Sequence, residues 1–293
     1  MRITCVAPYD FRLSWRMFTA FSGSCASSYG ALAAWWEEKP TLLNLQQTSE
    51  DPPVVEVIAH PLPRKSRLFL DHMRRILHAD LYLDPFYRAA EKEPRLREVT
   101  ADLRGLKPVR PPDIFQMMVI ALSEQQVSMT AALATRERII SSFGTAIGRL
   151  TAFPRPETLA AADVRELRSC GLSLRKAESL RELARLFASG EVDPEAWKDM
   201  EDRELVELLT SLQGVGQWTA EYVLLRGLGR LDVVPASDLG VRRAVGAYLA
   251  GGGVPSEAEV REILRPLSPW RGLAAFYLLA HQRRSQMGLD QAQ

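Results

Sequence analysis

The sequence predicts a mostly α-helical protein in which a small α+β N-terminal domain precedes a larger all-α domain. Its 293 residues correspond to about two domains of typical size. Apolar residues make up 46% of the chain and charged residues 25%, the balance of a folded globular protein. Before about residue 80, short apolar segments alternate with turn residues, whereas the remainder repeats apolar residues at helical spacing.

The N-terminal domain is predicted to cover residues 1–82. Strands are expected at 2–6, 42–47 and 54–58, because these segments are β-branched or leucine-rich and clusters of Ser, Gly, Pro and Asp separate them. A helix is expected at 66–78, where apolar residues recur with mixed three- and four-residue spacing.

The second domain, predicted over residues 83–293, consists of many short helices. The connector 107–112 contains three prolines and cannot continue a helix, and Asp113 stands at the N-cap position of the helix that follows. Helices are expected at 114–129, 131–143, 156–169, 174–188, 202–212, 217–229, 239–250, 256–264 and 270–284. They are too many for a simple helical bundle.

Composition excludes several classes of function. Lys and Arg total 37 against 36 acidic residues, so nucleic-acid binding would need a local patch rather than a global positive field. The three cysteines form no CxxC pair and the four histidines lack metal-ligand spacing, so we expect no metal site or iron–sulfur cluster. With neither a signal-like N-terminus nor a membrane-length apolar stretch, the sequence predicts a cytoplasmic protein without a membrane partner.

The segment 212–222, Leu-Gln-Gly-Val-Gly-Gln-Trp-Thr-Ala-Glu-Tyr, joins two predicted helices through a glycine turn. Gly214 and Gly216 allow a sharp bend and leave backbone N–H groups unobstructed at a helix N-terminus. Such a hairpin can bind a phosphate without reading a base. Taken alone, the two glycines also fit an ordinary connection between helices.

Asp238 follows the hairpin, in the segment Val233-Val-Pro-Ala-Ser-Asp, at the start of another predicted helix. By itself it is a typical capping residue. Together, hairpin and aspartate resemble the helix-hairpin-helix and Gly/Pro-rich loop plus Asp signature of the base-excision DNA glycosylases. The residues that carry this resemblance are Leu212, Gly214, Gly216, Thr219, Ala220, Asp232, Pro235 and Asp238.

Trp218 indicates which branch of these glycosylases the chain resembles. It stands where family members that also cleave the DNA backbone have a lysine. A tryptophan cannot form an imine, so the chain resembles a monofunctional enzyme. Without clustered cysteines it also differs from the iron–sulfur branch, and it is similar to the 3-methyladenine DNA glycosylase II family. The segments 8–10, 125–129 and 268–271 match that family as well.

The resemblance implies an enzyme that flips alkylated purines, such as 3-methyladenine and 7-methylguanine, out of double-stranded DNA and hydrolyses the N-glycosidic bond. Asp238 would stabilise the oxocarbenium-like sugar and orient water. An aromatic pocket favours a cationic base, and Trp218 and Tyr222 lie four residues apart on one helix face. The implied base-pocket residues are Gln125, Trp218, Tyr222 and Trp270, although the three aromatic residues also fit a hydrophobic core.

The implied DNA contacts come from the hairpin and from nearby polar side chains. These residues are Gly214, Val215, Gly216, Thr219, Gln126, Arg242 and Arg271. Gln126 would fill the gap left by the flipped nucleotide, with Val127 as the other candidate. We expect no metal and no cofactor, although a monovalent cation on hairpin carbonyls is compatible with the family, and we expect a monomer that is nucleoid-associated when bound to damaged DNA.

Two other functions stay open. A related glycosylase could use the same pocket for oxidised or deaminated bases. A non-catalytic helix-hairpin-helix protein could hold DNA without cleaving it, although it would need neither Asp238 nor the pocket aromatics.

Overall fold

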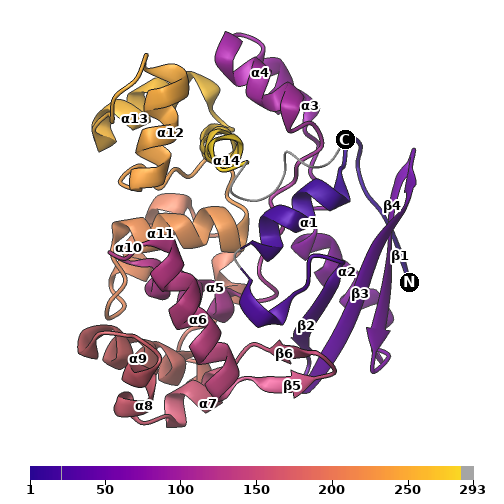
Figure 1. Ribbon diagram of the computed structural model, residues 1–293, viewed down its shortest axis with the longest axis vertical. Helices are drawn as coiled ribbons and strands as arrows, with labels where there is room; N and C mark the ends of the chain where they lie inside the picture. Colours follow the sequence, from indigo (N-terminus) through magenta and orange to yellow (C-terminus); the bar gives the residue numbers. More distant parts are fainter. Residues whose placement is uncertain (21, 285–293) are drawn as a thin grey trace.

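The computed structural model describes residues 1–20 and 22–284, so residues 285–293 of the predicted second domain lie outside the described residues. It confirms a mostly α-helical fold with a small sheet near the N-terminus (Figure 1). Within the described residues, no helix is both long and apolar enough to cross a membrane.

The N-terminal sheet is antiparallel, with strand order β1-β4-β3-β2. Its strands are β1 (Arg2–Thr4), β2 (Ala31–Trp36), β3 (Lys39–Glu50) and β4 (Pro53–His60). Alternate residues of β4, among them Val55 and Val57, are buried, as expected for a sheet with one covered face. The sequence missed β2 because its residues are mostly Ala and Trp, and its pairing with β3 stabilises it.

Two helices cover this sheet, α1 (Phe11–Thr19) and α2 (Ser66–Ile76). Both contribute to the cluster of buried side chains that includes Trp15, Leu43 and Phe69. Helix α1 was not predicted, although Asp10 caps it by accepting a hydrogen bond from Leu13 N–H. In Figure 1, α1 lies between the sheet and the remaining helices.

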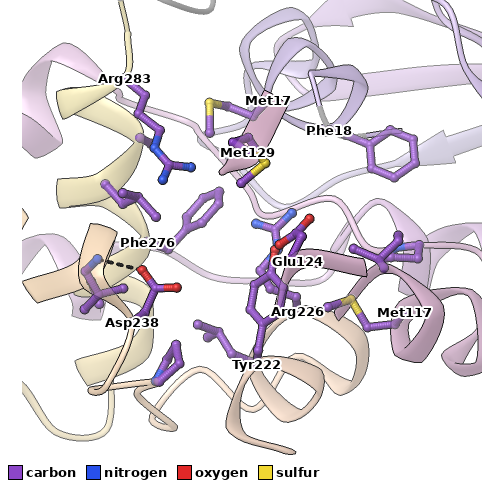
Figure 2. Close-up of a pocket in the computed structure, with 18 of the residues that line it drawn as sticks. Met17, Phe18, Met117, Glu124, Met129, Tyr222, Arg226, Asp238, Phe276 and Arg283 are labelled. Carbon is purple, nitrogen blue, oxygen red and sulfur yellow. Dashed lines mark hydrogen bonds between the residues drawn. The ribbon is translucent and has the colours of Figure 1, made fainter. Parts of the chain in front are cut away.

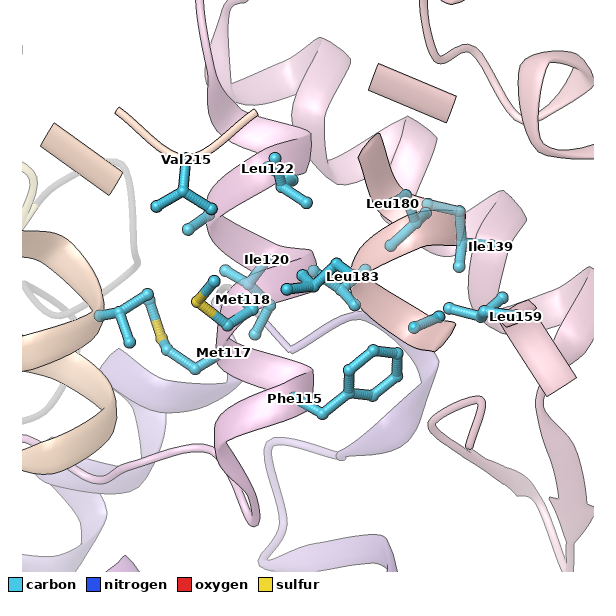
Figure 3. Close-up of a cluster of buried hydrophobic side chains, with 14 of the residues drawn as sticks. Phe115, Met117, Met118, Ile120, Leu122, Ile139, Leu159, Leu180, Leu183 and Val215 are labelled. Carbon is cyan, nitrogen blue, oxygen red and sulfur yellow. The ribbon is translucent and has the colours of Figure 1, made fainter. Parts of the chain in front are cut away.

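The remaining helices surround two further clusters of buried side chains. Helix α5 is central to the first, which Figure 3 shows with Val215 of the hairpin packed beside Leu122. The second cluster joins α3 and α4 to α12, α13 and α14. Met17 of α1 belongs to the second cluster and Val109 belongs to the sheet cluster, so the boundary at residue 82 stays a prediction.

The helices of this region are α3 (Asp84–Ala90), α4 (Pro94–Asp102), α5 (Ile114–Glu124), α6 (Met129–Phe143), α7 (Pro156–Ala161), α8 (Val164–Ser169), α9 (Leu174–Ser189), α10 (Asp202–Thr210), α11 (Gln217–Val223), α12 (Leu239–Leu249), α13 (Glu257–Leu264) and α14 (Arg271–Gln282). Short helical turns lie at Gly23–Cys25, Pro194–Trp197 and Arg265–Leu267, and a β-hairpin joins β5 (Thr145–Ile147) to β6 (Leu150–Ala152).

Three predicted helices are interrupted. The helix expected at 114–129 ends at Glu124, since Gln125 has a ψ of 125° and Gln126 a φ of 53°, and Ser128 then caps α6. The one expected at 156–169 is divided by Asp163, which forms a capping box for α8. The one expected at 217–229 continues from α11 into a π-helical turn, Leu224–Leu228.

Candidate active site

The glycine hairpin connects α10 to α11. Gly214 has a φ of 82°, and an added Cβ there would lie 2.4 Å from Ser179 Oγ, so both conformation and packing require glycine. Gly216 caps α11 and has open space around it. Val215 is buried, so any contact that this residue makes with a ligand comes from its main chain.

Gln125 fastens this hairpin to the end of α5. Its Nε2 donates to Gly214 O at 2.9 Å and to Thr219 Oγ1 at 2.8 Å. The Gln125 carbonyl accepts a hydrogen bond from Lys176 Nζ. The two predicted site residues Gln125 and Thr219 therefore hold the hairpin in place through their hydrogen bond. Thr219 is buried.

Asp238 is held by two N–H donors. Its Oδ1 accepts from Val241 N–H at 2.9 Å, which makes it the N-cap of α12, and its Oδ2 accepts from Trp218 Nε1–H at 2.9 Å. The Trp218 ring stacks on Tyr222 with centroids 5.2 Å apart. The structure thus brings three predicted residues together, with Trp218 positioning the carboxylate.

Asp238 and Tyr222 line a cavity of about 100 Å³, or about 930 Å³ with the space that opens to solvent. Its lining comes from α1, α5, α6, α11, α12 and α14 and consists of Met17, Phe18, Ser22, Pro111, Met117, Ile120, Glu124, Met129, Tyr222, Leu225, Arg226, Pro235, Asp238, Val241, Ala275, Phe276, Leu279, Ala280 and Arg283. Figure 2 shows Asp238 and Phe276 on one side, and Glu124, Arg226 and Tyr222 on the other.

The model for HhH-GPD superfamily base excision DNA repair proteins matches residues 119–269, a segment that contains both the hairpin and Asp238. The chain belongs to the HhH-GPD superfamily. It is 29% identical over 200 residues to a DNA-3-methyladenine glycosylase of Bacillus subtilis, a match covering 67% of this chain and 66% of the relative, slightly less than two thirds of its length.

Solved structures of DNA glycosylases agree with this assignment. The 3-methyladenine DNA glycosylase of Archaeoglobus fulgidus superposes with a TM-score of 0.83 at 27% identity, covering 96% of this chain and 98% of that one. The Schizosaccharomyces pombe 3-methyladenine DNA glycosylase, solved with abasic DNA, gives 0.60 at 28% identity, covering 67% of this chain and 95% of that one.

Of the four residues predicted for the base pocket, Tyr222 lines this cavity, whereas Gln125, Trp218 and Trp270 are not among the described residues that line it. The predicted DNA contacts Arg242 and Arg271 do not line it either. Trp270 packs in the second helical cluster, 6.4 Å from the ring of Phe86. Arg271 forms a two-point ion pair with Asp232, with Nη2–Oδ2 at 2.6 Å and Nε–Oδ1 at 2.8 Å. Arg242 Nε donates to the Pro255 carbonyl at 2.7 Å.

Several lining residues escaped the sequence analysis. Phe276 and Leu279 of α14 and Arg283, which directly follows it, recur at helical spacing, and this spacing could have identified them. Arg226 follows Tyr222 by four residues, on the same side of the helix. The contribution of Met17 from α1 carries no comparable sequence signal, because it depends on how the N-terminal unit packs.

Burial shifts the pKa of two side chains that line the cavity, Tyr222 and Arg226. It raises the pKa of the Tyr222 phenol, which stays neutral. Burial also lowers the pKa of the Arg226 guanidinium, whose charge lies over the Phe276 ring at 4.7 Å from the centroid. Across residues 1–20 and 22–284, no group of three or more His, Cys, Asp or Glu side chains could hold a metal ion.

Proposed function

We propose that the protein is a monofunctional DNA glycosylase that removes alkylated purines from double-stranded DNA. The observation that carries this proposal is the carboxylate of Asp238, held by Val241 N–H and Trp218 Nε1–H at the wall of an aromatic and thioether-lined cavity. The named activity of the B. subtilis and A. fulgidus relatives supports the same substrate class.

The reaction follows from the charge that develops when the base leaves. Alkylation gives the purine a positive charge and makes it a better leaving group, and the sugar becomes oxocarbenium-like. Asp238 would stabilise that sugar and orient the attacking water, because its two N–H donors fix the carboxylate before the reaction begins. With Trp218 in place of a lysine, the reaction stops at an abasic site, since no imine forms.

The cavity suits a flipped, electron-poor base. Tyr222 and Phe276 offer aromatic faces, and Met17, Met117 and Met129 offer polarisable thioethers. These groups favour a cationic ring over a neutral, unmodified base. Tyr222 keeps its predicted role in this proposal, while Trp218 acts through Asp238.

DNA would approach the hairpin and the loop between α5 and α6. Main-chain N–H groups at the start of α11 would bind a phosphate. In the loop, Gln126 and Val127 are exposed, Val127 to 47%, and Gln126 has a φ of 53°. We propose that Gln126 enters the base stack, with Val127 as the other candidate. Arg242 remains a candidate for a phosphate contact, whereas Arg271 is engaged by Asp232.

No step of this reaction uses a metal or an organic cofactor. The hairpin carbonyls of Leu212 and Gly214 accept hydrogen bonds from Val215 N–H and Gln125 Nε2. Because each carbonyl oxygen has a second lone pair, a monovalent cation stays compatible with the hairpin. A monomeric state, a cytoplasmic location and association with the nucleoid on DNA binding stay predictions.

The proposal is tested by incubating the protein with dimethyl sulfate-treated duplex DNA and identifying the released bases by mass spectrometry. We expect free 3-methyladenine or 7-methylguanine, and strands that break only after alkali. Tight DNA binding with no released base would contradict the proposal and favour a non-catalytic DNA-binding protein. Release of only oxidised or deaminated bases from matched duplexes would assign a different substrate.

A further inference from the structure

The wall opposite Asp238 carries two charged side chains that the proposed hydrolysis does not use. Glu124, at the end of α5, and Arg226, in the π-helical turn after α11, both line the cavity, and Figure 2 shows them side by side with Tyr222. Charged groups are rare in such an apolar lining and require a reason.

The position of Glu124 is unfavourable for a carboxylate. Glu124 ends α5, where the helix dipole disfavours a negative charge, and its side chain is only 6% exposed. An ion pair with Arg136, whose side chain is 1% exposed, fixes the orientation of the carboxylate. The carboxylate is therefore a preorganised hydrogen-bond acceptor at the cavity.

Arg226 supplies the complementary donor. Within the described residues it makes one hydrogen bond, from Nη2 to Val109 O at 3.4 Å, and its guanidinium lies over the Phe276 ring. A guanidinium has five N–H donors in a rigid fork. The π-helical turn that places it is a rare backbone feature that is often found at functional sites.

We propose that Glu124 and Arg226 recognise the edge of the flipped base, Glu124 by accepting an N–H and Arg226 by donating to a neighbouring acceptor. This inference rests on the proposed glycosylase function and narrows its substrates. Purines with an intact Watson–Crick edge fit, since 7-methylguanine offers O6 beside N1–H and 3-methyladenine offers N1 beside its amino group. A base whose edge is bridged, such as 1,N6-ethenoadenine, offers no N–H and leaves Glu124 unpaired in a desolvated pocket.

The test compares single-turnover excision of methylpurines from methylated duplex DNA with excision of 1,N6-ethenoadenine from a duplex of the same sequence. In the wild type we expect ethenoadenine to be excised at least about tenfold more slowly. Glu124→Gln keeps the size of the side chain and a hydrogen bond to Arg136 but adds an N–H donor. It should raise the ratio of ethenoadenine to methylpurine excision by about tenfold or more.

Glu221→Gln is the matched control, because Glu221 is also a buried glutamate that is ion-paired with an arginine, Arg261, at 2.6 Å, but it does not line the cavity. Its excision ratio should equal that of the wild type. Arg226→Met should slow methylpurine release by about tenfold while leaving affinity for DNA with a tetrahydrofuran abasic analogue unchanged, because that ligand has no base to read.

Wild-type excision of ethenoadenine at the methylpurine rate, or no rise in the ratio for Glu124→Gln, overturns the inference. Equal losses of methylpurine release and abasic-DNA affinity in Arg226→Met assign that residue a structural role and also overturn it. Failure of the wild type to release any methylpurine would instead contradict the proposed function itself.

Discussion

At the scale of single residues, Asp238 combines two tasks through its two oxygens. Oδ1 caps α12 through Val241 N–H, and Oδ2 accepts from Trp218 at the cavity wall. A capping aspartate is common, and the sequence alone favours that role. The second N–H donor, which comes from a different helix, is what fixes the carboxylate for chemistry.

Replacing Asp238 by Asn should lower single-turnover base release by at least about 10²-fold, because the negative charge that stabilises the sugar is lost. Asparagine caps helices about as well as aspartate, so folding and affinity for abasic-analogue DNA should be kept. Asp163→Asn, at the N-cap of α8, is the matched control and should retain full activity. Normal base release from Asp238→Asn would remove this residue from the mechanism.

Trp218→Phe tests whether the Trp218 N–H positions the Asp238 carboxylate for the reaction. The phenyl ring can still stack on Tyr222, but Asp238 Oδ2 loses its N–H donor. Hydrogen bonds to charged groups contribute about 1.5–3 kcal/mol, so base release should slow by about tenfold or more with little change in DNA affinity. Trp197→Phe, in the first helical cluster, serves as the control. A slower rate accompanied by an equal loss of affinity would instead indicate that Trp218 contacts DNA.

At the scale of elements, the hairpin illustrates how a local motif depends on its surroundings. Gly214 fits against Ser179 of α9, and Gln125 at the end of α5 bonds both the turn and the first turn of α11. The glycine pattern was visible in the sequence because it reflects local backbone conformation. The Gln125 contacts were not, because they join residues about ninety positions apart.

Gly216→Glu should weaken binding to DNA of any sequence by about tenfold at low salt, since it places a negative charge where a phosphate would bind. Nothing lies within 4 Å of a Cβ added at this position, so the side chain can be accommodated. Gly216→Ala is the control and should bind nearly as the wild type. Equal affinities for the Glu and Ala variants across a salt titration would show that the hairpin is not the phosphate anchor.

At the scale of the whole molecule, buried polar contacts connect the N-terminal unit to the helices around the site. His78, after α2, bonds Pro108 O through Nδ1 at 2.7 Å and accepts from Arg110 Nε through Nε2 at 2.8 Å. Arg110 also donates to Leu228 O at the end of the π-helical turn. Because Met17 and Phe18 line the cavity, this connection helps to maintain the site.

This connection predicts acid sensitivity. Burial, together with the Arg110 charge, lowers the pKa of His78 well below its usual value of 6.5. Below pH 6.5 the unfolded chain binds a proton that the folded chain does not, so this stabilisation is complete above pH 6.5 and is lost as the pH falls. The loss for one such group is at most about 1.4 kcal/mol per pH unit.

Urea unfolding at pH 7.5 and pH 5.5 measures this effect. His78→Gln should reduce the difference in unfolding free energy between the two pH values by about 1 kcal/mol, even though the variant is less stable at both. His60→Gln, at an exposed position, should keep the wild-type difference. An unchanged pH dependence in His78→Gln would contradict the protonation argument. Burial also lowers the pKa of His72 to about 4, so the wild type loses stability over the same range from a second group.

The sequence by itself determined the mostly helical fold, the hairpin with Gly214 and Gly216, and Asp238 at a helix start. These features depend on backbone conformation, capping and spacing within a few residues, so residue types alone reveal them. The end of α5 was misjudged because Gln125, which is not a residue that usually breaks a helix, leaves the helical conformation with a ψ of 125°.

Only the tertiary structure decided which side chains meet. It joined Trp218 to Asp238, paired Arg271 with Asp232, placed Trp270 in a core, and brought Met17 and Glu124 to one cavity. Each of these outcomes depends on contacts between elements far apart in the chain. Such contacts are selected by how whole helices bury their apolar faces, and the spacing within any one segment does not contain that information.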